Sequence, residues 1–150
     1  VHIGCTCENQ ETADRRLPVF LELPIRRRSI IHEPMLERID IQPYLERYGT
    51  RVDAVLCGGE SGPDARVCDY EWICWTRAQC VRYGVPFCFR QTGARFRKDG
   101  KLYRVPRGEQ MRQARRAGID YRYGHGRSRR PDRPPEGQRS LFGDGADGAQ

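Results

Sequence analysis

Three glutamates stand at the ends of short apolar runs that are typical of buried β-strands. They are Glu8, Glu33 and Glu60. A segment of helical composition follows each run, and in a parallel β/α arrangement the carboxyl ends of the strands lie on one face. That face holds the ligands of open α/β sheets and of β/α barrels. We therefore predict that the three carboxylates converge on one pocket.

Further polar groups follow the same strand ends. In Gly58-Gly59-Glu60-Ser61, the two glycines leave room for a backbone to approach a ligand closely, and the serine adds a hydroxyl. Asn9 follows the first run, and Gln91 follows a fourth predicted strand at 85–90. The predicted ligand site comprises Glu8, Asn9, Glu33, Gly58, Gly59, Glu60, Ser61 and Gln91.

Structural roles explain some of these residues equally well. Glycine and serine are usual in a turn that ends a strand, Asn9 can cap the following helix, and a glutamate can pair with an arginine. Arg90 is expected to point away from the ligand face or toward a helix. If the residues form a ligand site, their carboxylates and amides could bind amino groups, ribose hydroxyls or a hard cation. Crowded carboxylates also raise one another's pKa, which serves acid–base chemistry. The residue types do not choose among these ligands.

The seven cysteines do not form a metal-binding pattern. Cys68, Cys74 and Cys80 are six residues apart, and on a helix each step turns the side chain by roughly 240°, so the three face different directions. Cys5 and Cys7 share one strand face but have no second pair nearby. We predict no zinc site. The odd cysteine count indicates a reducing cytoplasm, and the absence of an apolar run of membrane-spanning length argues against a membrane protein.

The order of predicted elements indicates an α/β fold. Strands are expected at 1–8, 26–33, 52–57 and 85–90, and helices at 10–23, 37–48 and 70–83. Pro18 should kink the first helix or split it into two turns. This alternation predicts a half β/α barrel, or an open parallel sheet of about four strands, over residues 1–93.

The remainder of the chain is basic. Residues 95–139 carry 15 basic and 5 acidic side chains, whereas residues 1–94 carry 12 and 13. We predict a hairpin and helix extension over 94–123, with its turn at Asp99-Gly100, and a disordered tail over 124–150. The charge favours an anionic partner, nucleic acid before membrane, although a solvated arginine-rich tail explains it equally well.

Four motifs resemble a known family when taken in order. They are Gly4-Cys5-Thr6-Cys7-Glu8-Asn9-Gln10, His32-Glu33-Pro34-Met35-Leu36, Val55-Leu56-Cys57-Gly58-Gly59-Glu60-Ser61-Gly62-Pro63 and Val85-Pro86-Phe87-Cys88-Phe89-Arg90-Gln91. Over about residues 1–105 the chain resembles the C-terminal half of the bacteriophage and bacterial "gene product 37 / gene product 68" family, whose function is unknown. Members look related to radical S-adenosylmethionine proteins.

This resemblance implies that S-adenosylmethionine and an iron–sulfur cluster serve the complete protein. The predicted strand-end residues would then line the face for S-adenosylmethionine or substrate. The cluster cysteines belong to an N-terminal half that we expect to be missing, because no Cys-x3-Cys-x2-Cys occurs here. We expect this chain alone to hold neither cofactor, and whether it is an enzyme stays open.

A short motif in the tail indicates a second function. The sequence Gln138-Arg139-Ser140-Leu141-Phe142 resembles the peptide that docks bacterial DNA polymerases on the replication sliding clamp. In such peptides the leucine and phenylalanine anchor in an apolar pocket, and the glutamine hydrogen-bonds at its edge. Gln138, Leu141 and Phe142 are therefore candidate partner-binding residues, although three specified positions also recur by chance. The alternative function is thus a DNA-associated adaptor without catalysis, and a third possibility is an inactive phage remnant.

Overall fold

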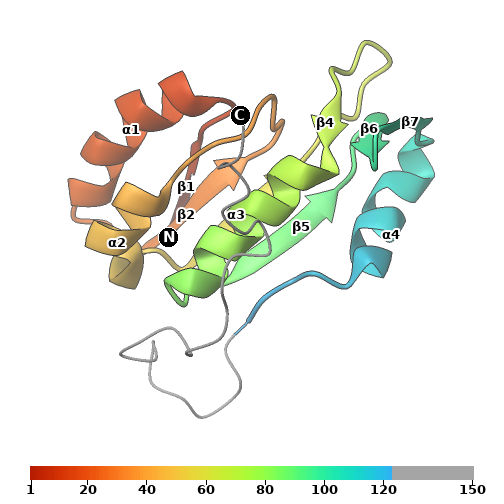
Figure 1. Cartoon of the computed structure of the whole chain (residues 1–150). Coiled ribbons are helices and arrows are strands. Elements are labelled where there is room, and N and C mark those ends of the chain that lie inside the picture. Colours follow the sequence, from red (N-terminus) through yellow and green to blue (C-terminus); the bar gives the residue numbers. More distant parts are fainter. Residues whose placement is uncertain (123–150) are drawn as a thin grey trace, which may run out of the picture.

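A computed structural model describes residues 1–122 of the chain (Figure 1). A four-stranded parallel sheet has the order β1-β2-β3-β5, and a smaller sheet has the order β4-β6-β7. The strands are β1 (His2–Thr6), β2 (Arg27–His32), β3 (Ala54–Gly58), β4 (Cys68–Asp69), β5 (Phe87–Gln91), β6 (Arg95–Lys98) and β7 (Lys101–Arg104). The helices are α1 (Gln10–Glu22), α2 (Gln42–Tyr48), the short 3-10 turn Gly49–Arg51, α3 (Tyr70–Arg82) and α4 (Arg107–Ala117). The predicted α/β fold with four parallel strands is confirmed.

The two faces of the parallel sheet differ in how they are covered. Helices α1, α2 and α3 lie over one face (Figure 1), where Ile30, Val55 and Phe87 are neighbours across three strands and are buried. On the opposite face the next residues of these strands, among them Ile31 and Leu56, are only half-buried. Within residues 1–122, β1 pairs with β2 alone, so its other edge has no partner there. A sheet with one covered face and one free edge is compatible with both predicted forms, a half barrel and an open parallel sheet.

Helix α1 shows how local sequence positions the strands around it. Asn9 caps it, because its Oδ1 accepts a hydrogen bond from Thr12 N at 2.9 Å while Thr12 Oγ1 accepts one from Asn9 N at 3.2 Å. Pro18 does not split the helix, which runs without a break from Gln10 to Glu22, so that part of the prediction is wrong. Pro18 has no N–H and leaves one helical hydrogen bond unmade. The buried stripe that contains Leu17 and Leu21 packs on the core and keeps the helix intact at this position.

The C-terminal end of α1 is stabilised from β2. Arg28 is 4% exposed, and its guanidinium donates hydrogen bonds to the carbonyls of Leu21 at 2.8 Å, of Leu23 at 2.9 Å and of Ile25. A cation at the carboxyl end of a helix also interacts favourably with the helix dipole. Arg28 therefore ties α1 to the sheet.

The basic extension adopts the predicted hairpin and helix. Asp99 and Gly100 both have positive φ, 51° and 73°, as a two-residue hairpin turn requires. Phe96 of β6 and Ala114 of α4 are buried in the same core cluster as the sheet. The hairpin and α4 are thus packed against the body of the protein.

The predicted disordered tail at 124–150 lies outside the described residues. Within residues 1–122 no helix combines the length and the apolar character that crossing a membrane requires.

Candidate functional site

Glu33 lines a cavity at the carboxyl ends of the parallel strands. The cavity has a volume of about 230 Å³. Its lining residues are Glu33, Ser61, Arg90, Gln91, Arg107, Gln110 and Met111. Three of these were predicted as site residues, and they come from the ends of β2, β3 and β5. The other side of the cavity is formed by the first turns of α4.

Glu33 is held by neighbours from β5. Its Oε1 accepts a hydrogen bond from Gln91 Nε2, and its Oε2 lies 3.6 Å from Arg90 Nε. The side chain is 17% exposed. A carboxylate that is mostly buried but still borders a cavity can accept further hydrogen bonds from a ligand.

Gly58 makes this arrangement possible. A Cβ atom at that position would lie 3.0 Å from Glu33 Cδ and 3.1 Å from Gln91 Cγ. A side chain there would push these two residues apart. The structure therefore brings together Gly58, Glu33, Gln91 and Ser61 from the predicted set.

Gly59 allows the backbone at the end of β3 to lie close to the backbone that follows β5. A Cβ on Gly59 would overlap Thr92 O and would lie 2.8 Å from Gly93 Cα. Gly59 N donates to Gln91 O at 3.1 Å, and Ala94 N donates to Glu60 O at 2.8 Å. These contacts fix the end of β3 against the end of β5, which sets the position of Gln91.

Glu60 is engaged by Arg66. Arg66 Nε and Nη2 donate to the two carboxylate oxygens at 3.0 and 2.9 Å, and the Arg66 backbone N–H donates at 2.9 Å. The hydrogen bonds from the Arg66 side chain and backbone lower the pKa of Glu60 to about 2. The expectation that crowded carboxylates raise one another's pKa is wrong at this residue, because the arginine dominates.

Glu8 and Asn9 also have partners within the fold. Glu8 Oε2 lies 3.0 Å from Arg16 Nη1, and the Asn9 side chain caps α1. The pKa of Arg66 is raised chiefly by its hydrogen bond with Glu60, and the Glu8 charge adds a smaller contribution. The positive charge of Arg66 therefore interacts with both Glu8 and Glu60. Of the three glutamates, Glu33 alone borders the cavity.

Sequence reasoning missed the cavity residues that α4 and β5 supply. Arg90 was expected to point away from the ligand face or toward a helix. It pairs with Glu33 and lines the cavity that α4 borders on its other side, so the first alternative is wrong. Gln110 is 2% exposed, donates from Nε2 to Val105 O at 3.1 Å, and has no partner for its Oε1. Nothing in the sequence pattern of a basic helix indicates that its glutamine reaches the strand ends.

The cysteines do not converge on a cluster site. Cys5 Sγ and Cys7 Sγ are 3.9 Å apart, while Cys68 lies on β4, before the helix that carries Cys74 and Cys80. No group of three or more His, Cys, Asp or Glu residues that could hold a metal ion occurs within residues 1–122. An iron–sulfur cluster requires more thiolates than this pair provides. The described residues therefore do not fit that cofactor.

The predicted clamp-binding residues Gln138, Leu141 and Phe142 lie outside the part of the chain that the structure describes.

A family comparison places the chain among proteins of unknown function. The family described as "Protein of unknown function (DUF5131)" matches residues 1–129, and the chain belongs to it. No curated protein and no solved structure matches the chain. Membership in an uncharacterised family is thereby confirmed, while the relation to radical S-adenosylmethionine proteins stays a prediction.

Proposed function

We propose that this member of the DUF5131 family is the ligand-facing part of a radical S-adenosylmethionine-like β/α barrel. The observation that carries the proposal is the cavity at the carboxyl ends of β2, β3 and β5, with Glu33 at its wall. Strand carboxyl ends are where parallel β/α folds bind their ligands. The half-covered sheet and the free edge of β1 support the same reading.

The size of the cavity limits what it can hold. Its volume of about 230 Å³ falls below the roughly 300–1,000 Å³ of sites that enclose a whole drug-sized ligand. We therefore assign it to the amino-acid end of S-adenosylmethionine and not to the whole nucleoside. Glu33 and the unpartnered Gln110 Oε1 would accept hydrogen bonds from the ammonium group, and Arg107 would face the carboxylate.

The chain's own residues bind and orient in this proposal. S-adenosylmethionine supplies radical chemistry only together with a reduced iron–sulfur cluster, which the described residues do not fit. The cluster thiolates would come from another β/α segment, added at the free edge of β1. The half-buried side chains of the uncovered sheet face, such as Ile31 and Leu56, would then lie inside the closed barrel.

The sequence led us to expect that the chain alone holds neither cofactor, but the cavity beside Glu33 leads us to propose that the chain itself binds S-adenosylmethionine. Calorimetric titration of the chain with S-adenosylmethionine tests this proposal. Glu33→Gln should weaken binding by about tenfold or more, because a charge-assisted hydrogen bond contributes about 1.5–3 kcal/mol. Glu46→Gln removes an exposed carboxylate on α2 and serves as the matched control. If the wild type shows no binding, or if both variants bind as the wild type does, the proposal is wrong.

The cluster assignment needs a separate experiment. The chain is expressed from its gene together with any coding sequence that lies upstream in the same frame, and iron and sulfide are supplied under anaerobic conditions. The proposal expects the absorbance of an iron–sulfur cluster from the longer protein, and its absence would remove the radical S-adenosylmethionine part of the assignment.

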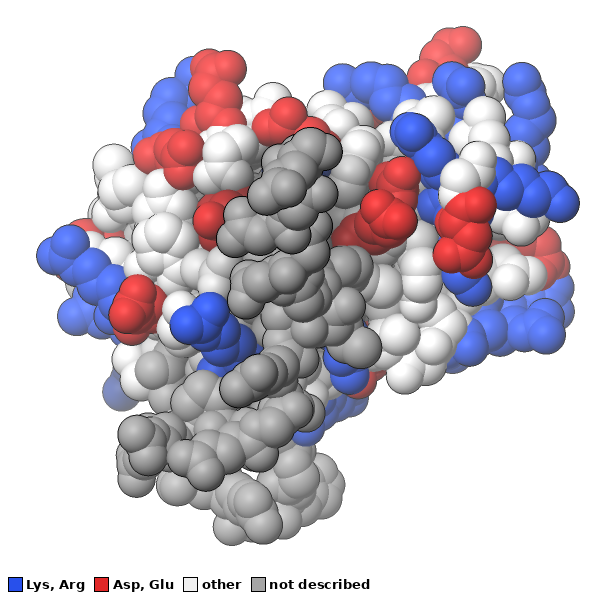
Figure 2. Space-filling view, in the orientation of Figure 1, with Lys and Arg blue, Asp and Glu red and all other residues white. Residues whose placement is uncertain are grey.

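A second candidate function is supported by charge. Residues 94–122 carry ten basic and three acidic side chains, and basic side chains gather over the region of β6, β7 and α4 (Figure 2). We propose that this basic surface binds nucleic-acid phosphates, as in a DNA-associated adaptor. Binding should weaken steeply with salt, because neutralised phosphates release counterions. A protein that retains no nucleic acid at low salt would refute this function.

The same adaptor would dock on the sliding clamp through Gln138, Leu141 and Phe142. A pull-down with purified clamp should retain the wild type and lose the variant Leu141→Ala/Phe142→Ala. Equal retention of the two proteins would refute docking through this motif.

A further inference from the structure

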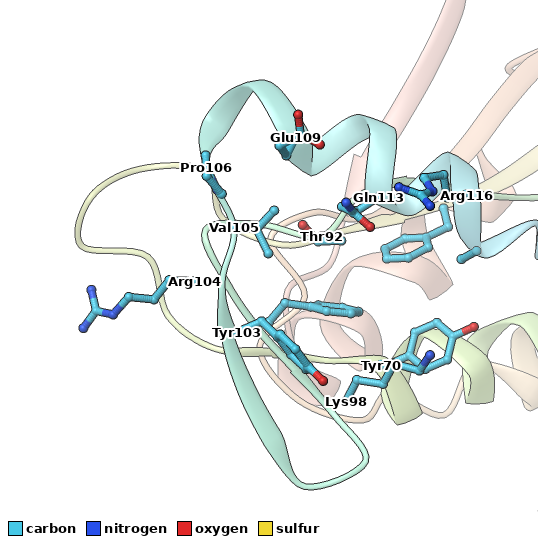
Figure 3. Close-up of a pocket in the computed structure, with 13 residues that line it drawn as sticks. Tyr70, Thr92, Lys98, Tyr103, Arg104, Val105, Pro106, Glu109, Gln113 and Arg116 are labelled. Carbon is cyan, nitrogen blue, oxygen red and sulfur yellow. The ribbon is translucent and has the colours of Figure 1, made fainter.

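A second and larger cavity lies on the other side of α4. Its volume is about 630 Å³, within the range of small-molecule sites. The β6–β7 hairpin and the start of α3 form one wall, and α4 forms the other (Figure 3). Pro106, Gln113 and Arg116 of this wall differ from the α4 residues that line the Glu33 cavity. The two cavities are therefore separate sites.

The floor of this cavity is aromatic. Phe89 and Phe96 are stacked with ring centroids 6.0 Å apart, and Tyr70 meets Phe96 edge-on at 5.9 Å. Both phenylalanines are nearly fully buried, so they belong to the core. Tyr70 is half-buried and Tyr103 is 42% exposed, and these two rings are the accessible aromatic surface. An exposed ring beside a cavity offers a face on which a planar ligand can stack.

Cationic groups accompany both accessible rings. Lys98 Nζ lies 5.2 Å from the centre of the Tyr70 ring, and Lys101 Nζ lies 5.2 Å from the centre of the Tyr103 ring. Arg116 lines the cavity from α4, whereas Arg104 points away from it (Figure 3). The carboxylate of Glu109 forms an ion pair with Arg112. The cavity therefore presents aromatic faces and positive charge together.

We propose that this cavity binds an unpaired base of single-stranded nucleic acid. The base would stack on Tyr103, and the flexible ammonium groups of Lys98 and Lys101 would pair with the flanking phosphates. Aromatic rings interleaved with cations are the pattern by which proteins hold single strands without reading their sequence. A paired base inside a duplex cannot enter a recessed cavity, which makes the single strand the preferred form. This inference rests on the second proposed function and specifies the form of nucleic acid.

Fluorescence anisotropy with a short labelled oligothymidylate tests the inference on the full chain. Tyr103→Ala should weaken binding by about fivefold or more, since that is roughly the smallest factor that stacking on one ring contributes. Tyr103→Phe keeps the ring and should bind as the wild type does. Leu102→Ala alters the neighbouring exposed residue of the same strand and should also leave binding unchanged. Thermal melts verify that each variant is folded.

The salt dependence of binding distinguishes the contribution of charge from the contribution of stacking. Lys98→Gln should reduce the slope of log affinity against log salt by about 0.7, the value for one phosphate contact on a single strand. Tyr103→Ala should leave that slope unchanged. Arg15→Gln, an exposed arginine on α1, is the control for loss of one positive charge.

Four outcomes are decisive. If no nucleic acid binds at low salt, both the second proposed function and this inference fail. If oligothymidylate binds but Tyr103→Ala binds within a factor of about two of the wild type, only the stacking site is refuted. Equal affinity for duplex and single strand, or full competition by a mononucleotide at the affinity of the oligonucleotide, would also overturn the single-strand assignment.

Discussion

The substitution Gly59→Ala tests how the strand ends are held together. The new Cβ would overlap Thr92 O and would lie 2.8 Å from Gly93 Cα, whereas ordinary contacts begin near 3.4 Å. One backbone segment must therefore retreat by about 0.6 Å to clear Gly93 Cα and by more to clear Thr92 O, and no flexible side chain is available to absorb the shift. Overpacking of this kind lowers the free energy of unfolding by about 1–3 kcal/mol. Alanine also restricts the unfolded chain more than glycine does, which raises the free energy of unfolding by about 0.4–1 kcal/mol.

We expect Gly59→Ala to lower the free energy of unfolding by about 1.5 kcal/mol, the difference between these two effects. For a chain of this size the melting temperature should then fall by roughly 3–6 °C. Urea denaturation followed by circular dichroism measures the change. Gly62→Ala is the matched control, because a Cβ there meets nothing within 4 Å, and it should change stability by less than about 0.5 kcal/mol. Equal stability of the two variants would show that the β3 and β5 ends are not in close contact.

Three further predictions follow from single side chains. Arg28→Met should destabilise the protein by about 3 kcal/mol in urea denaturation, because the carbonyls at the end of α1 lose a buried donor; a loss below about 1 kcal/mol would contradict this. The pKa of Glu60 is about 2 in the folded protein and 4.5 ordinarily, so its contribution to stability is present above pH 4.5 and is lost as the pH falls through about 2. Arg66→Gln should raise the Glu60 pKa in an NMR titration, and an unchanged value would refute the pairing. The hydrogen bond from Cys7 lowers the pKa of Cys5 to about 7, so iodoacetamide should alkylate Cys5 first, with a midpoint near pH 7 that Cys7→Ala moves upward. Uniform labelling of the cysteines in mass spectrometry would count against it.

Much of the fold could be predicted because its signals are local. The apolar run before Gly58 predicted a strand buried on both faces; the strand is present, but Leu56 on its second face is only half-buried. Asn9 marked the start of α1. Asp99-Gly100 specified the hairpin turn through its need for positive φ. The two-residue strand β4 was not foreseen, since it exists only through pairing with β6, far along the chain.

The site was harder to predict because its partners are distant in sequence. The two runs that contain Glu33 and Gly58 predicted a site at the strand ends. The hydrogen bond between Glu33 and Gln91 shows that two of the predicted site residues are in contact. The sequence could not indicate that Arg66 pairs with Glu60, because the pairing depends on the conformation of the loop between them. It also could not indicate that Gln110 would reach the cavity, because helix α4 is positioned by packing that no local pattern encodes.

NMR of protein labelled with ¹³C at the glutamate carboxyl carbons tests the central claim most directly. Addition of S-adenosylmethionine should shift the Glu33 resonance in a saturable manner and leave the exposed Glu46 resonance unchanged. A titration in which Glu33 does not move, or moves no more than Glu46, would contradict the claim that the cavity beside Glu33 binds the ligand.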